Sequence, residues 1–129
     1  MVNGSKILFK ELSYRINGII FAAHNELGKS CSENQYADAI EEKLKENNIK
    51  YEREKILSPS FKGELKGRNR VDFIIEGKLI LELKAKHFLT REDFYQTKRY
   101  LKATNLSLAL LVNFRQDRAM IKRVLNSSA

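Results

Sequence analysis

An apolar hairpin with a carboxylate in each strand is the feature of this chain that most restricts how it can fold. Residues 70–86 read Arg-Val-Asp-Phe-Ile-Ile-Glu-Gly-Lys-Leu-Ile-Leu-Glu-Leu-Lys-Ala-Lys. The β-branched and aromatic residues predict two strands, and Glu-Gly-Lys at 76–78 supplies the turn between them. Aspartate is depleted in strands, and glutamate to a lesser degree, yet Asp72 lies inside the first strand and Glu82 inside the second. These two positions need an explanation.

The alternation of side chains along a strand puts both carboxylates on one face. Successive residues point to opposite sides, so the leucines at 79, 81 and 83 share one face while Glu82 and Lys84 share the other. A three-residue turn at 76–78 keeps the leucine face uniform and places Asp72 opposite Glu82. A two-residue turn would set Asp72 opposite Leu81, unless a bulge restored the phase.

Two carboxylates in direct contact across a sheet repel each other unless a cation lies between them. Lys84 can supply part of that charge, and a hard divalent ion with oxygen ligands can supply the rest. The alternative is a solvated sheet face on which Asp72, Glu82 and Lys84 form ion pairs of little consequence. Ile74 and Ile80 fall on the same face and favour a partly covered site.

Two helices are expected before the hairpin. Apolar residues recur at helical spacing over residues 9–27, and Gly28 stands where a glycine commonly ends a helix. Within this helix, His24 is interpreted as a packed or capping histidine, with a catalytic role as the less favoured alternative.

The second helix is expected to follow a capping box formed by Ser32 and Gln35, and to run to about residue 47. Tyr36, Ile40 and Leu44 form its apolar stripe. Glu33 lies on that stripe by spacing. It is therefore either a first-turn charge that suits the helix dipole or a further active-site group that points inward.

The segments around the hairpin predict further strands and a third helix. Strands are expected at residues 51–57 and 61–65, separated by Ser-Pro-Ser, so that the hairpin extends an antiparallel meander. Residues 106–114 are almost continuously apolar, which is typical of a strand buried on both faces and parallel to a neighbour. Residues 120–125 suit a final edge strand, with a short helix as the alternative.

The third helix is expected to begin after Thr90, with Asp93 three residues later, and to end near residue 103 or 104. Gln96 and Tyr100 are one turn apart on it. The simplest interpretation of Gln96 is a solvated side chain. If the helix covers the charged face of the hairpin, Gln96 could instead orient a water molecule or a phosphate group.

The net charge favours a polyanionic partner, with nucleic acid as the leading candidate. The 129 residues carry a formal charge of +8. The basic residues proposed to contact nucleic acid surround the hairpin and the third helix: Arg68, Arg70, Lys86, Lys98, Arg99 and Lys102. A protein that simply carries many lysines is the alternative.

The size and the cysteine content place further bounds. The length suits one domain, residues 1–129, with a real core. A single cysteine, Cys31, rules out an intramolecular disulfide and fits a reducing compartment. There is no apolar run long enough to span a membrane and no signal-peptide core, so the cytoplasm is the expected location. A structural zinc site is not expected, because the sequence has no His/Cys cluster at ligand spacing.

The order of these features resembles the PD-(D/E)XK nuclease superfamily. The matching residues are Asp72, then Glu82-Leu83-Lys84, followed by a helix that carries Gln96 and Tyr100. More narrowly, the chain resembles the bacterial GxxExxY proteins. The segments that carry this likeness are residues 24–28, 33–36, 82–84, 100–104 and 112–114, although Ser30 stands at the first glycine of that name.

The resemblance implies a restriction-endonuclease-like α/β core, a mixed sheet flanked by helices in the order ααββββαββ. It also implies hydrolysis of phosphodiester bonds of nucleic acid, DNA in preference to RNA, with Mg²⁺ or Mn²⁺. Asp72, Glu82 and the backbone carbonyl of Leu83 would hold the ion, and Glu33 would bind it through water or hold a second one. Lys84 would orient the attacking water, while Gln96 and Tyr100 would position the scissile group.

Other classes of function stay open at this point. The chain could be a binding module that retains the fold without cutting, or an accessory subunit of a larger complex. Because enzymes that cut both strands often pair two active sites, a homodimer is also open.

Overall fold

The computed structural model describes residues 8–126. Its helices and strands follow in the order α1 (Lys10–Leu27), α2 (Glu33–Glu46), β1 (Tyr51–Ile56), β2 (Arg70–Ile75), β3 (Leu79–Lys84), α3 (Arg91–Thr104), β4 (Leu108–Asn113) and β5 (Met120–Leu125). Within this described part of the chain, no helix has the length and apolar character needed to cross a bilayer.

The five strands form one mixed sheet in the spatial order β1-β2-β3-β4-β5. Neighbouring strands are antiparallel except β3 and β4, which are parallel and are joined through α3. A parallel pair requires such a crossover connection, because a tight turn can only reverse the chain. The expected α/β class and the mixed sheet are therefore confirmed.

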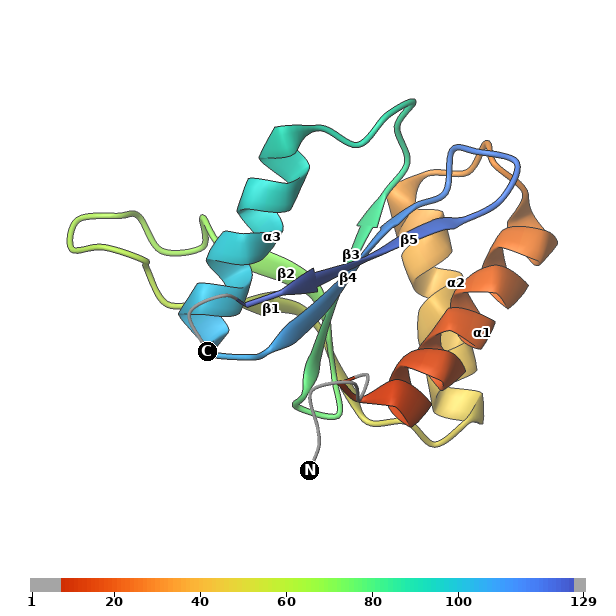
Figure 1. Ribbon diagram of the computed structural model, residues 1–129, viewed down its shortest axis with the longest axis horizontal. Helices are drawn as coiled ribbons and strands as arrows, with labels where there is room; N and C mark the ends of the chain where they lie inside the picture. Colours follow the sequence, from red (N-terminus) through yellow and green to blue (C-terminus); the bar gives the residue numbers. More distant parts are fainter. Residues whose placement is uncertain (1–7, 127–129) are drawn as a thin grey trace.

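Helices cover both faces of the sheet (Figure 1). The leucines of β3 at 79, 81 and 83 face α1 and α2, where they join a core that includes Ile20, Tyr36 and Phe73. Ile74 and Ile80 lie on the other face and pack with Tyr100 and Leu101 of α3. Because both faces are covered, β4 is buried along its whole length.

The helix boundaries follow the signals in the sequence. Ser32 and Gln35 form the expected capping box of α2, and Thr90 and Asp93 form one at the start of α3. His24 is buried near the end of α1, where its Nε2 lies 2.9 Å from the carbonyl oxygen of Gln116. The packed interpretation of His24 is the one that the structure supports.

The strand expected at residues 61–65 is wrong, and the element order is ααβββαββ. This segment lies in the connection between β1 and β2 and forms turns instead of a strand. Gly63, at the centre of this segment, adopts a φ angle of 102°, which lies outside the extended region of a β-strand. The carboxylate of Glu64 accepts hydrogen bonds from Ser60 and Asn69, so local side-chain contacts replace a ladder.

Leu81→Ala is expected to lower the free energy of unfolding by about 2–5 kcal/mol, because it leaves a cavity between the sheet and α2. Leu81 has no exposed surface. The matched control is Leu65→Ala, whose side chain is 64% exposed. Urea denaturation of both variants measures the difference, and an equal loss in the two would contradict the position of the core.

Candidate active site

The turn between β2 and β3 sets the register that brings Asp72 and Glu82 together. The strands pair Ile75 with Leu79 and Ile74 with Ile80, as a three-residue turn requires. The backbone ladder ends at the pair of Phe73 and Leu81, and beyond it the two strands are joined by hydrogen bonds between backbone N–H groups and carboxylate side chains. The backbone N–H of Asp72 donates to Oε1 of Glu82 at 3.1 Å, and the N–H of Leu83 donates to Oδ2 of Asp72 at 2.8 Å.

Glu82 is the buried member of this carboxylate pair, with 3% of its surface exposed. Burial raises the pKa of Glu82 well above its ordinary value, and the negative charge of Asp72 raises it further. A hydrogen bond from the Asp72 backbone and the positive charge of Lys84 lower this pKa but do not outweigh the other two effects. The pair therefore needs either a shared proton or a cation.

Lys84 extends from the end of β3 to α3. Its Nζ donates to Oε1 of Gln96 at 3.0 Å and lies 3.9 Å from Oδ1 of Asp93. Gln96 and Asp93 are three residues apart and lie on the same side of α3, so both side chains reach the ammonium group of Lys84. The structure thus brings Lys84 and Gln96 together, as the covered-site interpretation requires.

Tyr100 completes the α3 side of the site. Its pKa is raised, first by burial and then by the negative charge of Glu82, while a hydrogen bond from the Arg70 backbone lowers it. Tyr100 is 5% exposed and packs with Ile80, which lies on the same face of β3 as Glu82. The phenol of Tyr100 therefore remains a neutral hydroxyl that can donate or accept a hydrogen bond.

Asp93 and Asn113 support the site, and the sequence did not reveal this. The Nζ of Lys86 lies 3.0 Å from Oδ2 of Asp93, and the side chain of Asn113 bonds both the N–H and the carbonyl of Lys86. Burial raises the pKa of Asp93, but hydrogen bonds from Thr90 and Lys86 outweigh it and lower the pKa overall. The network fixes the chain just after Lys84. The sequence indicated this network only through Asp93, as a capping residue of the third helix, and through Asn113, as a polar residue at the end of an apolar strand.

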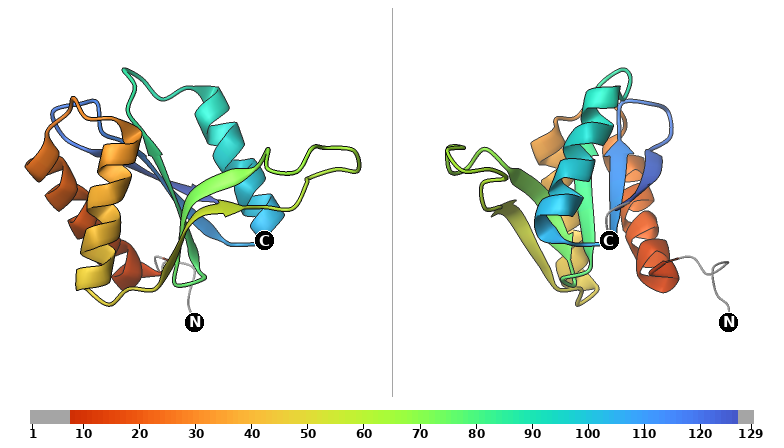
Figure 2. Two further views of the ribbon diagram at one scale, coloured as in Figure 1. Left: turned by 180° about the vertical axis from the view of Figure 1, so that it is seen from behind. Right: turned by 60° about the vertical axis from the view of Figure 1, so that its left-hand side comes forward.

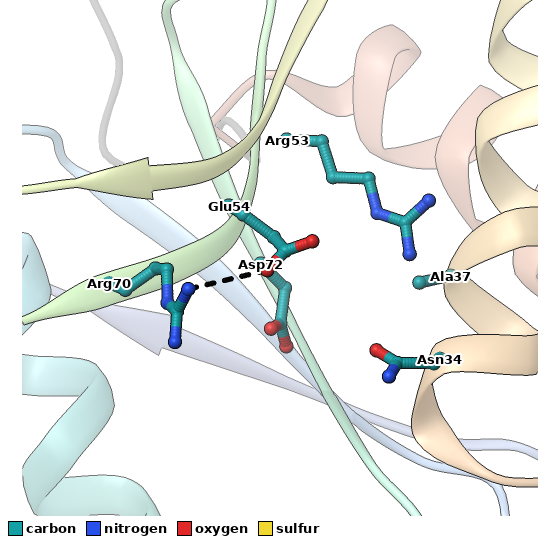
Figure 3. Close-up of a pocket in the computed structure, with 6 residues that line it drawn as sticks. All are labelled: Asn34, Ala37, Arg53, Glu54, Arg70 and Asp72. Carbon is teal, nitrogen blue, oxygen red and sulfur yellow. Dashed lines mark hydrogen bonds and ion pairs between the residues drawn. The ribbon is translucent and has the colours of Figure 1, made fainter.

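A pocket of about 270 Å³ opens beside Asp72, between the strands β1 and β2 and the start of α2 (Figure 3). The residues that line it are Asn34, Ala37, Arg53, Glu54, Arg70 and Asp72. The carboxylate of Asp72 and the amide of Asn34 face each other across it (Figure 3). Glu54, which has a φ angle of 53°, bonds Arg70 at 3.5 Å and was not predicted from the sequence.

Glu33 does not point into the core, contrary to the expectation from its spacing. It is the first residue of α2 and is exposed, because the buried stripe of that helix begins at Tyr36. Within residues 8–126, Glu33 makes no hydrogen bond or ion pair with Asp72, Glu82 or Lys84. Its neighbour Asn34 is the residue of this turn that lines the pocket.

Most of the basic residues expected to contact nucleic acid are exposed. Those at the surface are Arg68, Arg70, Lys98, Arg99 and Lys102. Lys86 is only partly exposed, and its ammonium group is engaged by Asp93. Its contact is therefore structural in this conformation.

In the absence of divalent ions, Glu82 is expected to make the protein less stable as the pH rises. The raised pKa means that the folded chain keeps a proton that the unfolded chain releases above its ordinary value of 4.5. The contribution of Glu82 to the free energy of unfolding is therefore greatest below pH 4.5 and is lost as the pH rises through the pKa that Glu82 has in the folded protein. Glu82→Gln, which cannot ionise, should flatten this dependence.

Urea unfolding in EDTA at mildly acidic and mildly basic pH measures this effect. The control is Glu46→Gln at an exposed position of α2. A wild-type pH dependence that survives in Glu82→Gln would contradict the assigned role of the buried carboxylate.

Comparisons with known proteins agree with this geometry. A family model described as the PD-(D/E)XK nuclease superfamily matches residues 10–124. The crystal structure of an alkaline exonuclease (LHK-Exo) from Laribacter hongkongensis is similar, with a TM-score of 0.51 and 8% sequence identity. The match covers 90% of this chain and 83% of that chain, and at this identity it shows the fold alone. No curated protein matches this sequence.

Proposed function

We propose that this chain, which belongs to the PD-(D/E)XK nuclease superfamily, hydrolyses phosphodiester bonds of nucleic acid with the help of a divalent metal ion. The observation that carries the proposal is the pairing of Asp72 with the buried Glu82, with Lys84 two residues further along the same strand. A purely structural ion-pair cluster gives no reason to keep a carboxylate whose pKa is raised by burial and then by the charge of its neighbour.

The chemistry of the donor groups fits a hard divalent ion such as Mg²⁺ or Mn²⁺. Asp72 and Glu82 offer carboxylate oxygens, and a positive charge between them would relieve the repulsion that raises the pKa of Glu82. Among residues 8–126, no group of three or more His, Cys, Asp or Glu side chains is arranged to hold an ion. The backbone carbonyl of Leu83 and water would complete the shell, since Mg²⁺ commonly keeps several waters.

A bound ion supplies two kinds of chemistry: it acidifies a water molecule and stabilises charge on the phosphate. The residues of the chain would orient the reactants. The ammonium group of Lys84, held by Gln96 and Asp93, would bind the attacking water or a phosphate oxygen. Gln96 uses its carbonyl oxygen for Lys84, so its NH₂ group would donate to the phosphate.

Tyr100 would position the scissile group through its hydroxyl, and Glu33 would act through a water molecule at the rim. The exposed Arg68, Arg70, Lys98, Arg99 and Lys102 would bind the sugar-phosphate backbone without reading its sequence. Their charge supports nucleic acid as the substrate, and DNA is proposed over RNA. We also propose membership of the narrower GxxExxY family, from the sequence segments given above.

Cleavage of labelled single- and double-stranded DNA and RNA tests the proposal. Wild type should cut with Mg²⁺ or Mn²⁺ and not with EDTA, and Asp72→Asn or Lys84→Ala should lower the rate about a hundredfold or more. The matched controls are Asp117→Asn and Lys122→Ala, which alter exposed residues away from these carboxylates.

Two results would count against this proposal. If the control variants lose as much cleavage activity as Asp72→Asn and Lys84→Ala, catalysis cannot be assigned to Asp72 and Lys84. Binding of nucleic acid that weakens with salt, without cutting under any condition, would favour the non-catalytic binding module.

A further inference from the structure

The connection between β1 and β2, residues 57–69, projects from the body of the protein past α3 (Figures 1 and 2). It is a folded loop with internal hydrogen bonds. The carboxylate of Glu64 accepts from the backbone of Ser60 at 2.7 Å and from the side chain of Asn69 at 2.9 Å. These bonds lower the pKa of Glu64, so the acid that closes the loop is ionised. We refer to residues 57–69 as the projecting loop.

The projecting loop exposes apolar side chains between cations. Phe61 is 63% exposed and Leu65 is 64% exposed, and each is followed in the sequence by an exposed lysine, Lys62 or Lys66. Arg68 adds a further exposed cation. An aromatic ring with cations around it is the composition of a surface that stacks bases and binds phosphates. The alternating cations make this surface a poor match for an apolar partner protein.

The base of the projecting loop is attached to the candidate active site. Leu57 and Val71 pack with Tyr100 and Leu101 beneath α3. The loop ends at β2, whose first residue, Arg70, lines the pocket together with Asp72 and precedes it by two residues. A strand of nucleic acid that lies on the loop would therefore lead directly to the carboxylates.

We propose that the projecting loop binds a single-stranded segment of nucleic acid, with a base stacked on Phe61 and phosphates beside Lys62, Lys66 and Arg68. This inference rests on the proposed function, because it assigns the loop to the same substrate. A single strand is required because the faces of its bases are accessible for stacking, whereas those of a duplex are covered by their neighbours.

The absence of tryptophan from the sequence permits a direct test. Phe61→Trp introduces one fluorescent ring at the proposed contact, and Tyr14→Trp introduces one on α1, where Tyr14 is 80% exposed. Each protein is titrated in EDTA with an oligothymidylate single strand and with a duplex. The single strand should quench Trp emission in Phe61→Trp and leave Tyr14→Trp unchanged. Quenching by the duplex that equals quenching by the single strand would overturn the assigned partner.

Phe61→Ala supplies the second measurement, by fluorescence anisotropy of a labelled single strand. The affinity of Phe61→Ala should fall roughly five- to 150-fold relative to wild type, as expected for the removal of one stacked base, and Phe61→Trp should retain affinity. Lys62→Gln with Lys66→Gln should flatten the salt dependence by a slope of about 0.7 for each phosphate that the variant no longer neutralises. Circular dichroism confirms that each variant is folded.

The two proposals fail in distinguishable ways. A wild type that cuts nucleic acid while Phe61→Ala binds normally and Phe61→Trp shows no quenching overturns the loop assignment and keeps the nuclease. Quenching and weakened binding without any cleavage keep the loop assignment and overturn the nuclease. No binding of any strand by the wild type, together with no cleavage when Mg²⁺ or Mn²⁺ is present, overturns both.

Discussion

The electrostatic repulsion between Asp72 and Glu82 is the constraint on which the rest of the structure depends. Glu82 lies on the face of the sheet that α3 covers, and this burial keeps water from it, while the carboxylate of Asp72 borders the pocket beside α2. The pKa of Glu82 is raised first by this burial and then by the negative charge of Asp72. A fold that keeps such a pair buried must compensate through a proton or a cation, and Lys84 is the nearest fixed charge on the same strand.

The helices and strands around Asp72 and Glu82 fix the directions of the polar side chains of the site. The leucine face of β3 is anchored on α1 and α2, which fixes the opposite direction for Glu82 and Lys84. The parallel pairing of β3 with β4 requires the α3 crossover, and α3 carries Asp93, Gln96 and Tyr100 to the charged face. Thus one topological feature supplies both the burial and the polar partners of the site.

Local signals in the sequence predicted much of this arrangement. The turn at 76–78 predicted that Asp72 and Glu82 meet, because register follows from turn length. The expected pair on one face is not formed, because the ladder ends at Phe73 and Leu81 and the contact runs from the backbone N–H of Asp72 to the Glu82 carboxylate. The helix boundaries followed from capping residues. The contact of Lys84 with Gln96 was expected only if α3 covered the charged face, which depends on the crossover rather than on local spacing.

The remaining features depend on tertiary contacts that no local pattern encodes. The exposed position of Glu33 reflects where α2 begins to contact the sheet, and helical spacing does not determine this. The segment at 61–65 has the composition of a strand, but Glu64 bonds within its own loop. Likewise, Asn113 reaches the backbone of Lys86 only because β4 is parallel to β3.

The most direct test of the central claim is a calorimetric titration of the protein with Mn²⁺ in buffers of different ionisation enthalpy. If Asp72 and Glu82 form a site that needs a cation, the ion will bind and release protons at mildly acidic pH, because the raised pKa leaves a proton to displace. Both the binding and the proton release should disappear in Asp72→Asn and Glu82→Gln. Binding of equal strength in the variants, or none in wild type, would contradict the claim.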